Sequence, residues 1–398
     1  MGLKRLVLTL LLLLVNSVSS AIVRSLPGFD GFLPFELEAG YLSVDEFDDV
    51  QFLYYFVKSE RNPREDPLLL WLTGGPGCSG LSDLLFTIGP LYFQNAEYNG
   101  SIPTLMLNPN SWTKVSNIIF LDAPVSTGFS YSLSLQGSET GDIISSHQLY
   151  TFLRKWLIDH PEFSTNPFYI GGMSYSGMTV PIVVQKIVTG NEAQSKPLIN
   201  LKCTERVNVP NILESRCVLA SPKPIWMKEI RRYLEEYLKN SLSDPDPEIP
   251  EFGCRTYGYL LSHYWANDEN VRKALRIKKG TVKTWTRCYR LPYTKDVHSA
   301  LNYHLNISLK GYRSLIYSGD HDMRIPYLGT EAWIKSLNFS ITDDWRPWFV
   351  GSQVAGYTRS YSNHMTFATV KGAGHTAPEY KPKECAAMFK RWISDNPL

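Results

Sequence analysis

Residues 167–190 read PFYIGGMSYSGMTVPIVVQKIVTG, a short apolar run followed by two glycines, two serines and a helical pattern. The apolar run predicts a strand that is buried on both faces, and the residues after the serines predict a helix. A serine in the tight turn between such a strand and helix is typical of a nucleophile elbow, G-x-S-x-G. Ser174 follows Gly172 at the right spacing but has Ser176 in place of the second glycine, whereas Ser176 lacks the first glycine. Ser174 is therefore the candidate nucleophile, and an ordinary glycine–serine turn is the alternative interpretation.

Other segments repeat this strand-then-loop design and alternate with helical patterns. Apolar runs that end in a glycine or aspartate loop occur at 66–75 (DPLLLWLTGG), 117–124 (NIIFLDAP) and 313–320 (RSLIYSGD), and 50–60 (VQFLYYFVKSE) alternates like an edge strand. Strands that alternate with helices predict an α/β doubly wound domain, with a mostly parallel twisted sheet and helices on both faces. The clearest helix is predicted at 141–163. Its apolar stripe consists of Ile143, Leu149, Phe152, Leu153, Trp156 and Leu157.

The overall composition is that of a large globular protein with little net charge. The 398 residues are 43% hydrophobic, and 40 Lys and Arg residues against 38 Asp and Glu residues give a net charge of +2. No long basic run is present, so neither nucleic acid nor an anionic membrane surface is an expected partner. The six cysteines form no C-x-x-C pair and none lies at metal-site spacing from a histidine, so no metal is expected. The glycine-rich loop at 71–80 lacks both a phosphate-loop Lys-Ser/Thr and dinucleotide-binding spacing, so we predict no cofactor.

The first 20 residues have the layout of a secretory signal peptide. Lys4 and Arg5 precede a ten-residue apolar run, and small residues then lead to a predicted cleavage near Ser20 or Ala21. The run is short for a membrane-spanning helix, and an uncleaved anchor is the alternative. Secretion gives meaning to three glycosylation sequons and favours structural disulfides among the cysteines. The sequons begin at Asn99, Asn306 and Asn338.

A serine nucleophile needs a histidine base and an acid that orients the histidine. In proteins with this elbow, the acid and the histidine follow the serine along the chain. His375 lies in the glycine-rich loop VKGAGHTAPEY after an apolar run, and His321 lies between Asp320 and Asp322 after RSLIYSG. The order Ser174, Asp322, His375 places all three residues at predicted strand ends. These residues form our predicted triad, with Asp320 as the alternative acid.

Acyl transfer also needs backbone N–H groups that stabilise the negative oxygen of the reaction intermediate. The loop WLTGGPGCSG (71–80) follows a predicted strand, and its glycines leave the backbone amides unobstructed by side chains. We therefore predict an oxyanion hole formed by the amides of Gly75 and of Tyr175, the residue after the candidate nucleophile.

The combined motifs closely resemble those of the serine carboxypeptidases, and especially the plant serine carboxypeptidase-like proteins, some of which are acyltransferases that use glucose esters. The resemblance extends from about Leu26 to the C-terminus, and it is carried by GGPGCSG, SWTKVSNIIFLDAPVSTGFSYS, GGMSYSGM, YSGDHDMRIP and GAGHTAPEY. It implies an α/β-hydrolase fold and the same triad and oxyanion donors, with Asp322 rather than Asp320 as the acid. Family members are often vacuolar, so the resemblance implies a protein of the secretory pathway that is extracellular or vacuolar.

The same resemblance implies a pairing for four of the six cysteines. It assigns no partner to Cys203 or Cys385. The implied disulfides are Cys78–Cys288 and Cys217–Cys254.

The substrate-binding positions depart from the pattern of a carboxypeptidase. The family recognises the free carboxylate of its substrate with an asparagine that opens the NGGPG loop and a glutamate just before the nucleophile. Here Thr73, followed by Gly74, and Met173 occupy these positions. Loss of both anchors is expected to cost roughly 1.5–3 kcal/mol per hydrogen bond to the charged group, which argues against efficient exopeptidase activity. Family acyltransferases carry Asp-Ser-Tyr-Ser-Gly at the elbow, so Ser176 fits them while Met173 fits neither group.

The middle of the chain is shorter than the resemblance predicts. PLINLK (197–202) continues directly into CTERVNVPNILESRC (203–217), where the family has several tens of further residues that include a strand. We therefore expect a missing sheet strand, an opened sheet edge and a reduced cap with an amphipathic helix at 225–242. The expected organisation is a signal peptide at 1–20, core segments at 21–200 and 268–398, and a cap insertion at 201–267.

Three functions are compatible with these observations. The favoured one is a secreted enzyme in which Ser174 takes an acyl group from an ester, such as a sugar ester, and passes it to an alcohol or water. The second is a serine carboxypeptidase that releases C-terminal residues, which the resemblance supports and which Thr73 and Met173 oppose. The third is a catalytically inactive, glycosylated binding protein, which the shortened middle suggests. The expected partner is a small ester or peptide substrate, and the sequence predicts no oligomeric state.

Overall fold

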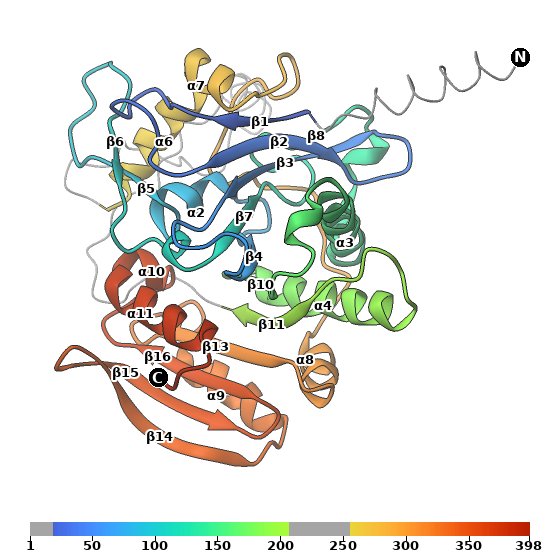
Figure 1. Ribbon diagram of the computed structural model, residues 1–398, viewed down its shortest axis with the longest axis vertical. Coiled ribbons are helices and arrows are strands. Elements are labelled where there is room, and N and C mark those ends of the chain that lie inside the picture. Colours follow the sequence, from blue (N-terminus) through green and yellow to red (C-terminus); the bar gives the residue numbers. More distant parts are fainter. Residues whose placement is uncertain (1–18, 207–254) are drawn as a thin grey trace, which may run out of the picture.

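Apolar runs of five residues form the middle of a large sheet. β4 (Leu68–Leu72), β7 (Asn117–Leu121) and β10 (Phe168–Gly172) are buried at every position, because helices cover both faces of the sheet (Figure 1). The computed structural model describes residues 19–206 and 255–398. Three predictions fall outside these described residues: most of the signal peptide, the cap helix at 225–242 and the Cys217–Cys254 disulfide.

The described strands build a twelve-stranded sheet in the order β1-β2-β3-β7-β4-β10-β11-β13-β16-β15-β14, with β8 paired to β3. The run from β7 to β16 is parallel, and antiparallel strands border it at both ends. The parallel centre confirms the predicted α/β class. The other strands of the sheet are β1 (Ser19–Val23), β2 (Leu37–Ser43), β3 (Val50–Val57), β8 (Tyr131–Ser132), β11 (Leu201–Arg206), β13 (Arg313–Gly319), β14 (Ile341–Val350), β15 (Gln353–Tyr361) and β16 (Met365–Val370).

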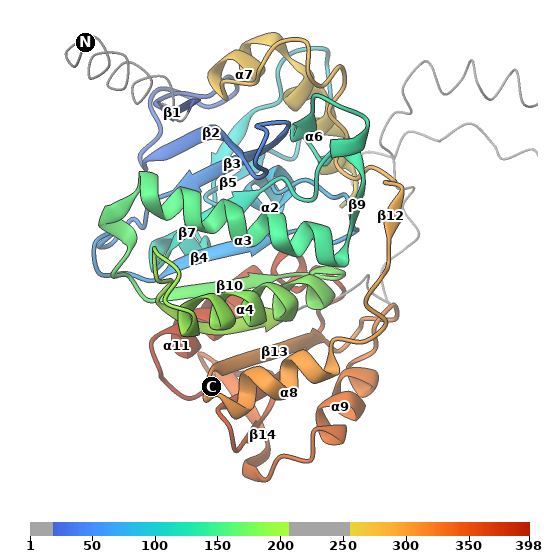
Figure 2. The same ribbon diagram turned by 90° about the vertical axis from the view of Figure 1, so that its right-hand side faces the viewer.

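Two layers of helices sandwich the sheet. α3 (Asp142–Asp159), α4 (Ser176–Glu192) and α8 (Leu301–Leu309) lie on one face, as Figure 2 shows. The opposite face is covered by α2 (Leu81–Phe86) and α11 (Pro382–Ile393), together with the other elements that share its apolar core. The remaining elements are α6 (Tyr257–Asn267), α7 (Glu269–Ala274), α9 (Tyr327–Ser336), α10 (Ala377–Tyr380), β5 (Leu91–Phe93), β6 (Leu105–Leu107), β9 (Thr140–Gly141), β12 (Tyr293–Thr294) and the 3-10 helices η1 (Trp112–Lys114), η2 (Gln136–Ser138) and η3 (Pro161–Phe163).

The structure corrects three sequence-based expectations. β3 is not an edge strand, because it lies between β2 and β7 and all of its residues except Gln51 are buried. Ile143 does not share the buried stripe of α3, because it lies in the first turn and is 41% exposed. The predicted gap in the sheet is also wrong. β11 follows α4 and pairs in parallel with residues 168–170 of β10 and residues 313–316 of β13, so a strand does occupy the place between them.

Candidate active site

Ser174 lies in a strained turn between β10 and α4. Its φ angle is 58°, in the left-handed region that non-glycine residues rarely adopt. Glycines make the turn sterically feasible. A Cβ atom at Gly172 would lie 2.6 Å from the carbonyl oxygen of Leu72, and one at Gly74 would lie 2.4 Å from Cβ of Ser174. Backbone strain of this kind persists where the surrounding structure enforces it, and such positions cluster at functional sites.

The second serine of the turn, Ser176, is buried and hydrogen-bonded to the backbone. The Oγ atom of Ser176 donates to the carbonyl oxygens of Leu72 and Thr73, with both distances at 3.1 Å. The side chain is buried, so it ties the start of α4 to the end of β4. The two serines of the motif are therefore placed differently, with Ser174 half-buried at the surface of a cavity and Ser176 behind it.

The loops after β13 and β16 bring His375 and Asp322 together. Nδ1 of His375 lies 3.5 Å from Oδ2 of Asp322. The Oδ1 atom of Asp322 accepts the amides of Arg324 at 2.9 Å and Ile325 at 3.3 Å, which fixes the carboxylate. The alternative acid, Asp320, has other partners: its Oδ1 atom accepts the amide of Gly372 and lies 3.8 Å from Nε2 of His321.

Burial sets the protonation of this pair. It raises the pKa of Asp322 to about 7, although the amides of Ile325 and Arg324 work in the opposite direction. Burial also lowers the pKa of His375, and the positive charges of Arg324 and Arg255 lower it further. The imidazole is therefore neutral over the physiological range of pH, which is the form that accepts a proton.

A cavity of about 440 Å3 connects Ser174 with His375. Both residues line it, and so do Thr73, Gly75 and Met173. Within the described part of the chain, no hydrogen bond joins Ser174 to His375. Hydrogen bonds between a nucleophile and its base are often long without substrate and tighten in the complex, so the shared cavity is the relevant observation.

The two amides predicted as oxyanion donors are both available. Among residues 19–206 and 255–398, neither the N–H of Gly75 nor that of Tyr175 donates a hydrogen bond to the protein. The amides of Met173 and Ser176, in the same turn, both donate hydrogen bonds to backbone carbonyl oxygens, at 3.1 Å each. Unused N–H groups beside a candidate nucleophile can donate to a developing negative charge.

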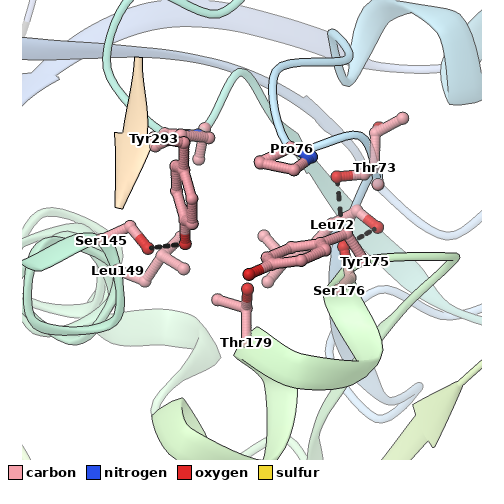
Figure 3. A pocket seen from close by; sticks show the side chains of 12 residues that line it. Leu72, Thr73, Pro76, Ser145, Leu149, Tyr175, Ser176, Thr179 and Tyr293 are labelled. Atoms are coloured by element: carbon pink, nitrogen blue, oxygen red, sulfur yellow. Dashed lines mark hydrogen bonds between the residues drawn. The ribbon is translucent and has the colours of Figure 1, made fainter. Parts of the chain in front are cut away.

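The side chain of Tyr175 is anchored by an aspartate that sequence reasoning missed. Its hydroxyl donates to Oδ1 of Asp142 at 2.9 Å, and the hydroxyl of Tyr293 donates to the same oxygen at 3.0 Å. Oδ2 of Asp142 accepts the amide of Val297 at 3.0 Å. Tyr175 and Tyr293 also line a small cavity beside the elbow, shown in Figure 3. The position of Asp142 in the first turn of a predicted helix was the only signal in the sequence, and it did not point to Tyr175.

Three arginines line the main cavity, and sequence reasoning missed all of them. Arg255 is paired with Glu379 at 2.6 Å. The guanidinium of Arg287 lies 3.9 Å from the centre of the Tyr259 ring. Among the described residues, neither Arg287 nor Arg324 has a carboxylate within salt-bridge distance. The cavity therefore carries positive charge, although the chain as a whole has little.

The two positions that depart from the carboxypeptidase pattern lie in the cavity wall. Met173 is 6% exposed and offers only a thioether. Thr73 turns its hydroxyl away from the cavity and donates it to the buried carboxylate of Asp83. Gly74, between Thr73 and the predicted oxyanion donor, is pressed against Ser174.

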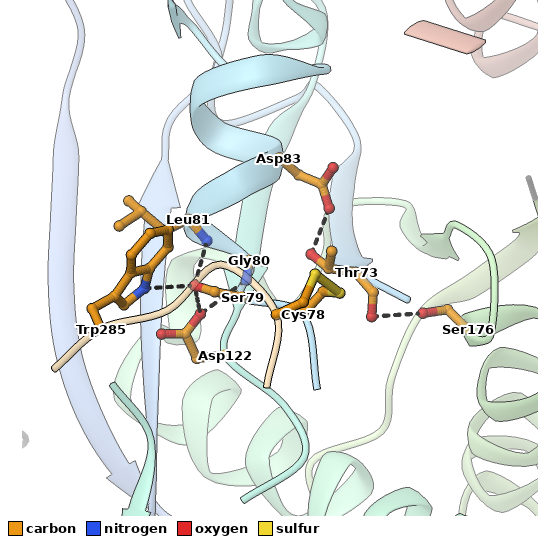
Figure 4. Close-up of a disulfide and its surroundings, with 10 residues drawn as sticks. Thr73, Cys78, Ser79, Gly80, Leu81, Asp83, Asp122, Ser176 and Trp285 are labelled. Atoms are coloured by element: carbon orange, nitrogen blue, oxygen red, sulfur yellow. Dashed lines mark hydrogen bonds between the residues drawn. A yellow bond between two sulfur atoms is a disulfide. The ribbon is translucent and has the colours of Figure 1, made fainter. Parts of the chain in front are cut away.

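A disulfide bond anchors the loop that carries Thr73 and Gly74. Cys78 and Cys288 are bonded, as the resemblance implied, and both lie in the cavity wall (Figure 4). The described residues contain no group of three or more His, Cys, Asp or Glu side chains that is arranged to hold a metal ion. None of the helices in this part of the chain is long and apolar enough to cross a membrane.

Comparison with known proteins places this geometry in a family. The family model described as serine carboxypeptidase matches residues 27–205 and 200–395. The chain belongs to the serine carboxypeptidase family. Serine carboxypeptidase-like 7 from Arabidopsis thaliana is 49% identical over 428 residues, which covers 99% of this chain and 98% of the relative. Serine carboxypeptidase-like 12 from the same plant is 50% identical and covers 98% of each chain.

A solved family structure confirms the α/β-hydrolase fold predicted from the motifs. A prohormone-processing carboxypeptidase from Saccharomyces cerevisiae superposes with a TM-score of 0.69 at 18% identity, covering 93% of this chain and 94% of that one. The family match also bears on the short middle of the chain. The alignment with serine carboxypeptidase-like 7 spans 428 positions against 398 residues here, so at least 30 of them have no counterpart in this chain. The two matched segments of the family model meet at 200–205, the place where the sequence indicated the shortening.

Proposed function

We propose that this family member is a serine-dependent acyltransferase or esterase that works through an acyl-enzyme on Ser174. The observation that carries the proposal is an acyl-transfer arrangement in a cavity whose wall has lost its carboxylate anchors. Met173 has no hydrogen to donate, and the hydroxyl hydrogen of Thr73 is committed to Asp83. Neither side chain is left to bind the C-terminal carboxylate of a peptide.

In the proposed reaction, Oγ of Ser174 attacks the carbonyl carbon of an ester while Nε2 of His375 takes the hydroxyl proton. Asp322 holds His375 through Nδ1, which leaves Nε2 as the basic nitrogen. The amides of Gly75 and Tyr175 stabilise the negative oxygen of the tetrahedral intermediate. The bond to the leaving alcohol then breaks, and His375 returns the proton to that alcohol. An acceptor alcohol or water attacks the acyl-enzyme with the same proton route and restores the hydroxyl of Ser174.

Carboxypeptidase activity is the second candidate, because one observation favours it. Arg287 and Arg324 line the cavity without a carboxylate partner among the described residues. A guanidinium binds a carboxylate through two parallel hydrogen bonds, so these side chains offer a different means of holding the end of a peptide. A peptidase of this kind would depend on the arginines rather than on Thr73 and Met173.

The decisive experiment expresses the chain from Ala21 and follows two reactions: acyl release from an activated or sugar ester, and cleavage of a blocked dipeptide. We expect ester turnover that Ser174→Ala abolishes and little peptide turnover. Peptide turnover that exceeds ester turnover and is lost in Ser174→Ala would replace the acyltransferase proposal with the carboxypeptidase one. Failure of a fluorophosphonate to label Ser174 would refute both and favour an inactive binding protein.

The missing anchors can be restored in the same background. The double variant Thr73→Asn, Met173→Glu supplies the two carboxylate-binding side chains of the family pattern. We expect it to raise the ratio of peptide turnover to ester turnover by at least tenfold, because each hydrogen bond to a charged group contributes roughly 1.5–3 kcal/mol. An unchanged ratio in a folded double variant would show that these two positions do not explain the substrate preference.

We further infer that the protein passes through the secretory pathway and acts outside the cell or in a vacuole. The predicted signal peptide and the Cys78–Cys288 disulfide support this inference, since disulfides persist in oxidising compartments. The asparagines of all three sequons are exposed, as glycan attachment requires: Asn99, Asn306 and Asn338.

A further inference from the structure

A buried carboxylate, that of Asp83, accepts a hydrogen bond from Thr73, which lies two residues before the predicted oxyanion donor Gly75 (Figure 4). Asp83, in the first turn of α2, has no exposed surface and does not line the cavity. Two hydroxyls donate to it, that of Thr73 to Oδ2 and that of Thr87 to Oδ1 at 2.8 Å. A carboxylate taken out of water is costly unless its oxygens are satisfied, so both hydroxyls help to keep it in the core.

Thr73 connects this carboxylate with the nucleophile elbow. Its hydroxyl donates to Asp83, and its carbonyl oxygen accepts Oγ of Ser176 at 3.1 Å. Only Gly74 separates Thr73 from Gly75. The backbone that leads to the oxyanion amide is therefore held from two sides, by α2 and by α4.

The loop has little room to drift without affecting Ser174. An added Cβ at Gly74 would lie 2.4 Å from Cβ of Ser174 and 3.0 Å from the amide nitrogen of Tyr175, so loop and elbow are already in close contact. An oxyanion donor is effective when it lies about 2.7–3.1 Å from the reacting oxygen. That range is only a few tenths of an ångström wide, so the position of the backbone before Gly75 bears directly on how well its amide can donate.

We propose that Asp83 is a positioning residue for acyl transfer: by holding the hydroxyl of Thr73, it fixes the backbone that aims the Gly75 amide at the reacting oxygen. The inference rests on the proposed function, because it requires Gly75 to be an oxyanion donor. A comparison with Thr87 distinguishes this positioning role from a purely structural one. It donates to the same carboxylate, but it lies at the C-terminal end of α2 and does not lead to the loop.

The test compares Thr73→Val with Thr87→Val, two changes that each remove one hydroxyl from the same carboxylate. The probe is p-nitrophenyl acetate in a pre-steady-state burst, where the amplitude counts competent sites and the rate constant reports acylation per site. We expect Thr73→Val to slow acylation at least tenfold and Thr87→Val to stay within twofold of the wild type. Complete loss of one oxyanion donor costs about 10²–10³-fold, which sets the upper limit. Thr73→Ser keeps the hydroxyl and should restore the rate.

Variants of Asp83 exclude a direct effect of Thr73 on the substrate, because Asp83 does not line the cavity. Asp83→Ala should slow acylation as Thr73→Val does, and the double variant should be no slower than either single variant, as expected for residues that act through one contact. Asp83→Asn should recover part of the rate, because its amide oxygen still accepts a hydroxyl. If Asp83→Ala does not fold, the acylation rate constants of Thr73→Val and Thr87→Val still test the positioning role.

The outcomes distinguish this inference from the proposed function on which it rests. A wild-type protein that gives no burst and no labelling of Ser174 overturns both. A wild-type burst with equal rate constants for Thr73→Val and Thr87→Val overturns the positioning role alone. Lower burst amplitude and melting temperature with an unchanged rate constant in Thr73→Val also overturn it, since they indicate a structural role.

Discussion

The change Asp83→Asn also has a consequence for the pH dependence of stability, because it removes a fully buried ionisable group without altering its shape. The two hydroxyls that donate to Asp83 can rotate to accept from an amide as well as donate to it. The substitution is therefore expected to preserve packing. It differs from the wild type mainly in having no charge to bury.

The sign and size of the effect follow from burial, which raises the pKa of Asp83 from 3.8 to about 6. Between these values the folded state binds more protons than the unfolded state, so the contribution of Asp83 is fully present below about pH 4 and is lost as the pH rises through 6. The difference corresponds to about 3 kcal/mol of unfolding free energy. The stability of Asp83→Asn relative to the wild type should therefore increase by about 3 kcal/mol from pH 3 to pH 7.5.

Urea unfolding followed by tryptophan fluorescence at half-unit pH intervals would measure this difference. Subtracting the two pH profiles cancels the contribution of every other group that titrates alike in both proteins. Asp30→Asn removes a carboxylate at an exposed position and serves as the matched control. Its plot of unfolding free energy against pH should run parallel to that of the wild type. Parallel profiles for Asp83→Asn and the wild type would show that Asp83 is not held in a costly ionised form.

Three further predictions concern the site and the pathway. Arg324→Gln removes one of the positive charges that lower the pKa of His375, so the acid limb of kcat/KM for a neutral ester should move to higher pH; an unmoved limb would contradict the electrostatic account. Gly74→Ala places a Cβ against Ser174 and should reduce its labelling by a fluorophosphonate at least 100-fold, whereas labelling at the wild-type rate would mean that the loop yields freely. Asn99→Gln should remove one glycan from the secreted protein, detected as a step in gel mobility that glycosidase treatment abolishes; identical mobility before treatment would exclude this sequon.

The fold class and the elements of the site were predictable where the signal is local. Strand, turn and helix around Ser174 follow from adjacent residues, and the Asp322 and His375 loops each follow an apolar run. The order of strands was less accessible. β3 resembled an edge strand because Gln51 and Lys58 suggest alternation, yet the aromatic residues between them fill both faces of a central strand. β11 formed despite the shortened middle, because β10 and β13 both present backbone groups that need partners.

The residues that sequence reasoning missed depend on contacts between distant segments. Arg287 and Arg324 are ordinary surface-type residues in the sequence, and only the fold places them in one cavity with Ser174. Asp83 gave no signal either, since a single aspartate in a short helix is usually solvated. Its interpretation requires the knowledge that the side chain is buried and that Thr73 points toward it.

The Cys78–Cys288 bond joins the segment that precedes the undescribed stretch 207–254 to the segment that follows it. A protease that cut once anywhere within that stretch would leave two polypeptides, one with Ser174 and the other with Asp322 and His375. The disulfide would keep them as one molecule that separates on a gel only after reduction. The parallel pairing of β11 with β13 would hold the same two pieces in register. The arrangement of the candidate triad therefore does not require an unbroken chain.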